Sequence, residues 1–380
     1  MNKLKNIGIS ALAGSLISLS AAEAGGVSVS GSWELSYTNL NHEKVTGNKL
    51  GMNKNLSFGA SGDVSDGGGV TWATTIGGSD ALGLSSASMN INMLGIATLA
   101  YDSGTGGYGA NAVDNIVPTA WEEIDYGLST GITDVGAVSA TKGSVHFSIN
   151  APKAGTGFSV SYAPRMGTGH QADGATGEGS GGAGVDVVID FINYDSTLFG
   201  WRFGVAGEYL MPEMTCDRQK KDLAISNTQL HSCQGKKDEP YAGTMYTKLH
   251  IGPLHLGTQA TFKNPQDNAV EGILNKRAIV GGAALVFGDT LSLSYGEAWD
   301  RYRYNNRNRA SGDGIYSHGT DDFLGSDFNE YETIRYRGWS AALNLGPLAL
   351  KGTRNKVGGK GEGGSSAPKS HSEVNLSLAF

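Results

Sequence analysis

The chain has 380 residues, of which 58 are glycine, 39% are hydrophobic and 17% are charged, and its formal net charge is −7. Glycine is about twice as frequent as the usual ~7%. It does not recur at every third residue, which excludes collagen, and no block of like charges marks a nucleic-acid arm. The negative net charge also argues against a nucleic-acid partner, because such binding depends on basic residues.

The first 24 residues have the pattern of a secretory signal peptide. Lys3 and Lys5 precede an uncharged run at 7–19, and Ala22-Glu23-Ala24 provides the small residues of a cleavage site. A membrane-spanning helix needs about 20 apolar residues, and this run is shorter. We therefore predict a signal peptide at 1–24 and a mature chain at 25–380 that enters an oxidising compartment.

The rest of the sequence lacks a run long enough for a membrane helix, since its longest apolar stretch is the eleven residues 278–288. Many segments instead alternate apolar and polar residues. In 27–37, large apolar residues alternate with serine and glutamate, and in 201–209 aromatic residues and valine alternate with polar or small ones. This period of two is typical of strands with one face toward lipid and one toward water.

The alternating segments predict sixteen strands. They cover residues 27–37, 52–62, 68–77, 86–92, 95–101, 144–151, 157–163, 184–194, 199–210, 241–251, 254–263, 275–287, 290–298, 333–345, 348–353 and 372–380. Connections such as 252–253 and 288–289 are tight turns, whereas 211–240 and 299–332 are long. An all-β transmembrane antiparallel barrel with short turns at one end and long loops at the other explains this alternation.

The C-terminal residues carry the most specific motif. Apolar residues occupy alternate positions of the last predicted strand, at Val374, Leu376, Leu378 and Phe380. With the signal peptide, this terminus resembles the Gram-negative outer-membrane porins of the general-diffusion, 16-stranded type, and the periodicity extends the resemblance over the mature chain. The resemblance implies a homotrimer among outer-membrane lipid and lipopolysaccharide, no cofactor, and insertion by the barrel-assembly machinery through Phe380.

In that family the third outer loop folds into the lumen and narrows it. Here the corresponding segment is 102–143, which is longer than unstructured loops in compact domains usually are. The candidate constriction residues are Asp114, Glu122, Glu123 and Asp125. The alternative is a solvated outer loop that is acidic like the rest of the chain.

A basic wall is expected to face these carboxylates. Arg202 and Lys248 are the clearest inward-facing cations, because both lie in strands with regular alternation. Arg335 and Arg337 are less certain, because a bulge at Gly338 would change the face that they occupy.

Catalytic and metal sites are not predicted. The scattered histidines lack a cysteine or carboxylate at metal-ligand spacing, and we interpret His146 and His255 as lumen-facing polar groups. Cys216 and Cys233, the only cysteines, lie in the long segment 211–240 and are expected to form a disulfide. That segment is otherwise expected to be a solvated surface lobe.

The sequence thus predicts a non-enzymatic porin, a water-filled channel for passive diffusion of small hydrophilic solutes and ions, with a modest cation preference. Two alternatives remain: a substrate-selective outer-membrane channel on the same fold, and a non-channel surface protein such as an adhesin-like barrel or a glycine-rich β-solenoid. A solenoid should repeat at a fixed period of about 20–30 residues, and this sequence does not.

Overall fold

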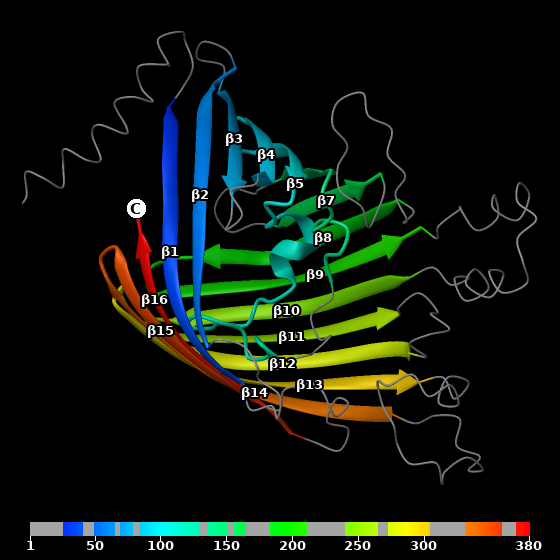
Figure 1. The fold of residues 1–380 in the computed structure, drawn as a ribbon. Coiled ribbons are helices and arrows are strands. Elements are labelled where there is room, and N and C mark those ends of the chain that lie inside the picture. Colours follow the sequence, from blue (N-terminus) through cyan, green and yellow to red (C-terminus); the bar gives the residue numbers. More distant parts are fainter. Residues whose placement is uncertain are drawn as a thin grey trace, which may run out of the picture.

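The chain forms a closed barrel of sixteen antiparallel strands in which β1 pairs with β16 (Figure 1). The computed structural model describes residues 26–40, 49–64, 69–78, 84–128, 135–149, 156–164, 183–211, 240–264, 273–304, 331–358 and 370–380. The strands are β1 Val27–Leu40, β2 Leu50–Asp63, β3 Val70–Gly78, β4 Leu84–Met93, β5 Ala97–Ser103, β6 Ser144–Ile149, β7 Gly157–Ala163, β8 Gly184–Asp195, β9 Phe199–Leu210, β10 Tyr241–Ile251, β11 Leu254–Asn264, β12 Ile273–Phe287, β13 Leu291–Tyr304, β14 Tyr331–Leu345, β15 Leu348–Gly358 and β16 Ser370–Ala379. The predicted sixteen-stranded barrel is confirmed.

Two strands extend five residues or more beyond their predicted ends. The alternation ended β13 at residue 298 and β15 at residue 353, whereas the strands continue to Tyr304 and Gly358. From Arg301 in β13 and Arg354 in β15 onward, the outward positions 301, 303, 354 and 356 hold arginine or lysine, so the apolar alternation stops although the hydrogen-bonded ladder continues. The extra strand length therefore carries charge on a face that is apolar elsewhere.

The two faces of the barrel wall differ in chemistry. One face bears large apolar side chains that are exposed, such as Trp33, Leu35, Tyr37 and Trp339. The opposite face bears small or polar residues, many of them buried by a segment that lies inside the barrel. The first face is the outer one, and its exposed apolar belt is the surface expected to meet lipid.

Tight turns join the strands at one end of the barrel. Gly252, Gly288 and Gly346 occupy these turns with φ between 55° and 67°, a conformation that favours glycine. A register shift between Asp190 and Ile192 in β8 is the bulge that rotates the end of that strand. The predicted tight turns at 252–253 and 288–289 are two of these turns.

No helix in the described ranges is long and apolar enough to cross a membrane. Among the same residues, no three His, Cys, Asp or Glu side chains are grouped so that they could hold a metal ion. The predicted signal peptide at 1–24 and the predicted Cys216–Cys233 disulfide lie outside the residues that the structure describes.

Candidate channel constriction

The segment that connects β5 to β6 lies inside the barrel. We call residues 104–143 the inner loop; the structure describes 104–128 and 135–143 of it. It contains the short 3-10 helix η1 (Gly109–Val113), and Figure 1 shows it, coloured cyan to teal, on the inner side of the wall beside β8 to β12. The predicted inward-folded third loop is therefore confirmed.

Side chains of β8, β9 and β11 hold residues 110–116 and Gly136 of the inner loop by hydrogen bonds. The Ala110 N–H donates to Asp186 Oδ1 of β8 (3.2 Å), and the Gly136 N–H donates to Glu208 Oε2 of β9 (2.9 Å). The Gln259 side chain of β11 both accepts and donates hydrogen bonds. Its Oε1 accepts from the Ile116 N–H (3.0 Å), and its Nε2 donates to the carbonyl of Val113 (2.9 Å). These buried side chains satisfy loop backbone groups that no secondary structure pairs.

Residues 120–126 of the inner loop are held by β13, β14 and β15. The Ala120 N–H donates to Ser294 Oγ of β13 (2.9 Å), and the Trp121 N–H donates to Ser340 Oγ of β14 (3.2 Å). Asn355 of β15 donates through Nδ2 to the carbonyls of Glu123 (2.9 Å) and Tyr126 (3.0 Å). The loop is thus fixed across a wide arc of the wall and is not a solvated outer loop.

Four inward-facing glycines on four successive strands let the loop lie close to the wall. They are Gly257 of β11, Gly282 of β12, Gly296 of β13 and Gly338 of β14. A Cβ at Gly282 would lie 2.5 Å from Val117 Cγ1, and one at Gly338 would lie 2.6 Å from Ile124 Cα. Val117 and Ile124 instead pack among buried residues of β12 to β14, including Ala298 and Tyr336. These four glycines account for part of the high glycine content, because they allow the loop to pack directly against the wall.

The loop carboxylates lie near wall carboxylates. Burial and the charges of Glu373, Glu123 and Glu34 raise the pKa of Glu122 to about 7, while Lys351 opposes the shift. Burial also raises the pKa of Glu123, with a smaller contribution from Asp125 and Asp114.

Glu34 is on β1 and Glu373 is on β16, so acidic groups from the loop and the closing strands share one region of the lumen. A cation in this region would meet favourable potential.

The predicted basic residues are placed elsewhere. Arg202 of β9 forms a two-pronged ion pair with Asp190 of β8, with Nε to Oδ1 and Nη2 to Oδ2 both 2.9 Å. Lys248 lies opposite Arg202 in the β9–β10 register and is half-buried on the inner face. Neither is among the charged groups that shift the pKa of Glu122 or Glu123. Arg335 and Arg337 share the outer face of β14 with Trp339, since no bulge interrupts that strand.

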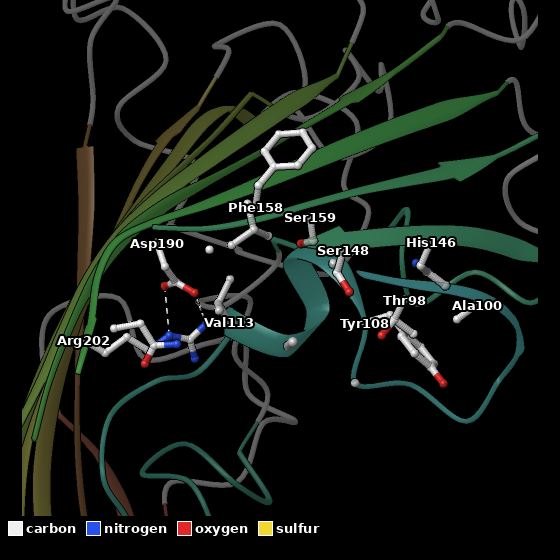
Figure 2. Close-up of a pocket in the computed structure, with 16 residues that line it drawn as sticks. Thr98, Ala100, Tyr108, Val113, His146, Ser148, Phe158, Ser159, Asp190 and Arg202 are labelled. Carbon is white, nitrogen blue, oxygen red and sulfur yellow. Dashed lines mark hydrogen bonds and ion pairs between the residues drawn. The ribbon is translucent and has the colours of Figure 1, made fainter. Parts of the chain in front are cut away.

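A cavity of about 310 Å³ lies between η1 and the wall formed by β5 to β9 (Figure 2). At one end the Asp190–Arg202 pair is capped by Tyr246, whose hydroxyl donates to Asp190 Oδ1 (2.7 Å). At the other end Tyr108 stacks on His146 with ring centroids 4.6 Å apart. His146 is thus an inward-facing polar group, as predicted. The paired charges and polar groups that line this cavity can form hydrogen bonds with water and small polar solutes.

Phe380 completes the barrel. Its carbonyl accepts from the Gly31 N–H (2.9 Å) and its N–H donates to the Gly31 carbonyl (3.0 Å), which extends the β1–β16 ladder by one pair. Phe380 is 58% exposed. The last residue therefore belongs to the seam where the barrel closes.

Solved structures of outer-membrane proteins have a similar fold. OmpF of Salmonella typhi in complex with daunomycin aligns with a TM-score of 0.57 at 10% identity, over 94% of this chain and 98% of that one. This chain has the porin fold. OmpT, an outer-membrane protein of Vibrio cholerae, in a trimer form aligns with a TM-score of 0.55 at 9% identity, over 94% of this chain and all of that one. A variant of the Rh. blastica porin aligns with a TM-score of 0.50 at 10% identity, over 93% and 100%. No protein-family model and no curated protein matches the sequence.

On this porin fold, several residues that shape the lumen were missed by sequence reasoning. Asp190 neutralises Arg202, Gln259 anchors the inner loop, and the glycine row seats it. Only the glycine row left a signal: Gly257, Gly282, Gly296 and Gly338 all fall at inward positions of the alternation.

Proposed function

We propose that the protein is a porin of a Gram-negative outer membrane, a water-filled channel for passive diffusion of small hydrophilic solutes and ions. The observation that carries the proposal is the inner loop, which is bonded to six strands of the wall inside a closed barrel. Such a loop narrows the lumen and limits the size of the solutes that can pass. No step of bond making or breaking is required.

The channel prefers cations in this proposal. The charges of Glu373, Glu123 and Glu34 act together on Glu122, and Lys351 is the cation that opposes them. Acidic groups at a narrow section attract cations because water there screens charge less effectively than in bulk. Arg202 contributes little to the field, because Asp190 neutralises it.

The assembly and membrane placement are part of the same proposal. The exposed apolar belt matches the surface that lipid covers in β-barrel membrane proteins. Phe380 at the seam fits a role as the signal for the barrel-assembly machinery, and the trimer form of the Vibrio cholerae relative supports a homotrimer. A signal peptide at 1–24 would direct export through the inner membrane.

The test is reconstitution of the refolded barrel in a planar bilayer. Stepwise increases in current, together with swelling of liposomes in small sugars but not in large ones, are expected for a diffusion channel. Barrels that insert and show heat-modifiable migration but conduct no ions would contradict the proposal and favour a non-channel surface barrel. Saturation of sugar flux at low concentration would favour the substrate-selective alternative.

A further inference from the structure

The cavity between η1 and the wall is lined by a row of hydroxyl groups from three adjacent strands. Thr98 of β5 lies opposite Ser148 of β6, which in turn lies opposite Ser159 of β7. Neighbouring strands are about 4.8 Å apart, so the row extends over about 10 Å of the inner face. We call these three side chains the hydroxyl row. Figure 2 shows Ser148 and Ser159 between η1 and the strands.

The hydroxyl row has no hydrogen-bond partner in the part of the chain that the structure describes. Other serines on the same inner face do have partners: Ser144 of β6 and Ser161 of β7 are buried, and each lies 2.9 Å from a ring nitrogen of His146. The hydroxyl row is only half-buried and faces the cavity. Because a hydroxyl both donates and accepts, the row can bind a ligand that does the same.

The charged groups of the cavity neutralise each other. Asp190 and Arg202 are the only Asp, Glu, Lys or Arg among the described residues that line it, and two contacts of 2.9 Å join them. Asp190 is 7% exposed, so a charged ligand that separated the pair would leave a buried charge without its partner. The cavity therefore suits a ligand that is polar but uncharged.

The inner loop contributes the apolar part of the lining. Ala112 and Val113 of η1 line the cavity together with Tyr108. The Tyr108 hydroxyl already donates to Asn90 Oδ1 (2.7 Å), and its ring stacks on His146 with the two planes 13° apart. Tyr108 therefore offers mainly aromatic carbon to the cavity. A ligand here meets hydroxyls from the wall and carbon surface from the loop.

We propose that this cavity binds one ring of a neutral sugar, through the hydroxyl row and the Asn193 amide on the wall and through Tyr108 and η1 on the loop. A sugar ring carries hydroxyls at its edge and C–H groups on its faces, which matches the division of the lining. The volume of about 310 Å³ is at the lower end of the range of about 300–1,000 Å³ for small-molecule sites, so it suits a single ring.

This site is separate from the acidic region of the lumen, because neither Glu122 nor Glu123 lines the cavity. A sugar bound there contacts both the inner loop and the wall, so it stabilises the loop in its place. The inference goes beyond the proposed channel and does not require the barrel to conduct ions.

The test measures sugar binding by the full-length barrel, refolded in a detergent without a sugar headgroup. The cavity variant T98V/S148A/S159A removes the hydroxyl row and keeps the Asp190–Arg202 pair. The probes are glucose and two charged relatives, glucosamine and glucuronate. The readouts are the dissociation constant from ligand-observed NMR and the temperature of unfolding at increasing probe concentration.

The matched control is S30A/S57A/T75V. It removes the same number of serine and threonine hydroxyls from the inner faces of β1, β2 and β3, outside the cavity. Comparison of the three probes on the unmodified chain needs no variant and tests the inference by itself.

Glucose should bind the unmodified chain and the control saturably and should raise the unfolding temperature of both. The cavity variant should bind glucose more weakly by about tenfold or more, since each hydrogen bond to a neutral ligand contributes about fivefold. Glucosamine and glucuronate should bind the unmodified chain more weakly than glucose, because the cavity has no free counter-charge to replace their hydration.

Equal glucose affinity in the control and in a heat-modifiable cavity variant would overturn the proposal, as would glucuronate binding as tight as that of glucose. A rise in unfolding temperature that never saturates and is the same in all three proteins would also overturn it, because sugars excluded from the protein surface act in this way. Saturable glucose binding by a barrel that conducts no ions would support this inference while contradicting the proposed channel.

Discussion

The glycine row beneath the inner loop offers a direct perturbation of the channel. Replacing Gly282 and Gly338 by alanine adds two methyl groups where the loop contacts the wall. The matched control is Gly207→Ala with Gly243→Ala in β9 and β10, where an added Cβ meets nothing closer than 3.6 Å. Both double variants remove two glycines from strands, so they share the same change in backbone freedom.

The structure sets the size of the effect. An added Cβ would lie 2.5 Å from Val117 Cγ1 at Gly282, and at Gly338 it would lie 2.5 Å from Asn355 Oδ1 and 2.6 Å from Ile124 Cα, whereas carbon atoms in contact lie about 3.5–4.0 Å apart. The loop must therefore retreat from the wall by about 1 Å at both places. Such overpacking costs about 1–3 kcal/mol per site, and the hydrogen bonds of Gln259 keep the loop from leaving altogether.

Single-channel conductance in a planar bilayer measures the result. The G282A/G338A variant should conduct less than the unmodified channel, because the loop moves into the water column, and its thermal stability should fall. The G207A/G243A control should keep its conductance. Equal conductance in both variants, with both migrating as folded barrels, would refute the placement of the loop on this wall.

Three further predictions concern charge, anchoring and assembly. Because burial and neighbouring carboxylates raise the pKa of Glu122 to about 7, raising pH from 5 to 9 should add negative charge there and increase cation preference. Glu122→Gln should reduce this pH dependence of the reversal potential. Gln259→Leu leaves N–H and C=O groups of the loop without a hydrogen-bond partner, and each such group destabilises the bound loop by about 1–3 kcal/mol. The inner loop of refolded barrels should therefore become cleavable by protease. The control Thr258→Ala changes the outer face of β11 and should leave the loop protected. Deleting Phe380 should leave unfolded precursor in the periplasm, and normal abundance of heat-modifiable barrel would show that the residue is dispensable.

The barrel itself could be predicted because a strand between lipid and water alternates apolar and polar residues, and this alternation is visible in the sequence. The ranges expected for β7, β9 and β10 agree with the structure within one residue. The pattern failed where the outer face stops being apolar: β13 and β15 continue past the predicted ends through Arg301 and Arg354. A period-two pattern is visible only where one face is apolar and the other is polar. Where the outer face carries arginine and the inner face is also polar, the pattern disappears.

The interior of the channel could be predicted only in outline. The resemblance to porins, together with the length of the inner loop, indicated that it folds inward, but its anchors pair residues far apart in the chain, as Ile116 with Gln259. Alternation likewise placed Arg202 on the inner face without showing that Asp190 neutralises it across the β8–β9 ladder. Contacts of this kind depend on strand register and on the β8 bulge, neither of which a single sequence specifies.

The zero-current potential in a KCl gradient tests most directly whether the inner loop sets the selectivity of the channel. The unmodified channel should give a potential of the sign that marks cation preference. The variant E122Q/E123Q/D125N keeps the shape of the loop and removes its carboxylates, so its potential should shift toward anion preference at neutral and alkaline pH. An unchanged potential and an unchanged conductance in that variant would contradict the account, because the carboxylates would then lie away from the narrow section of the pore.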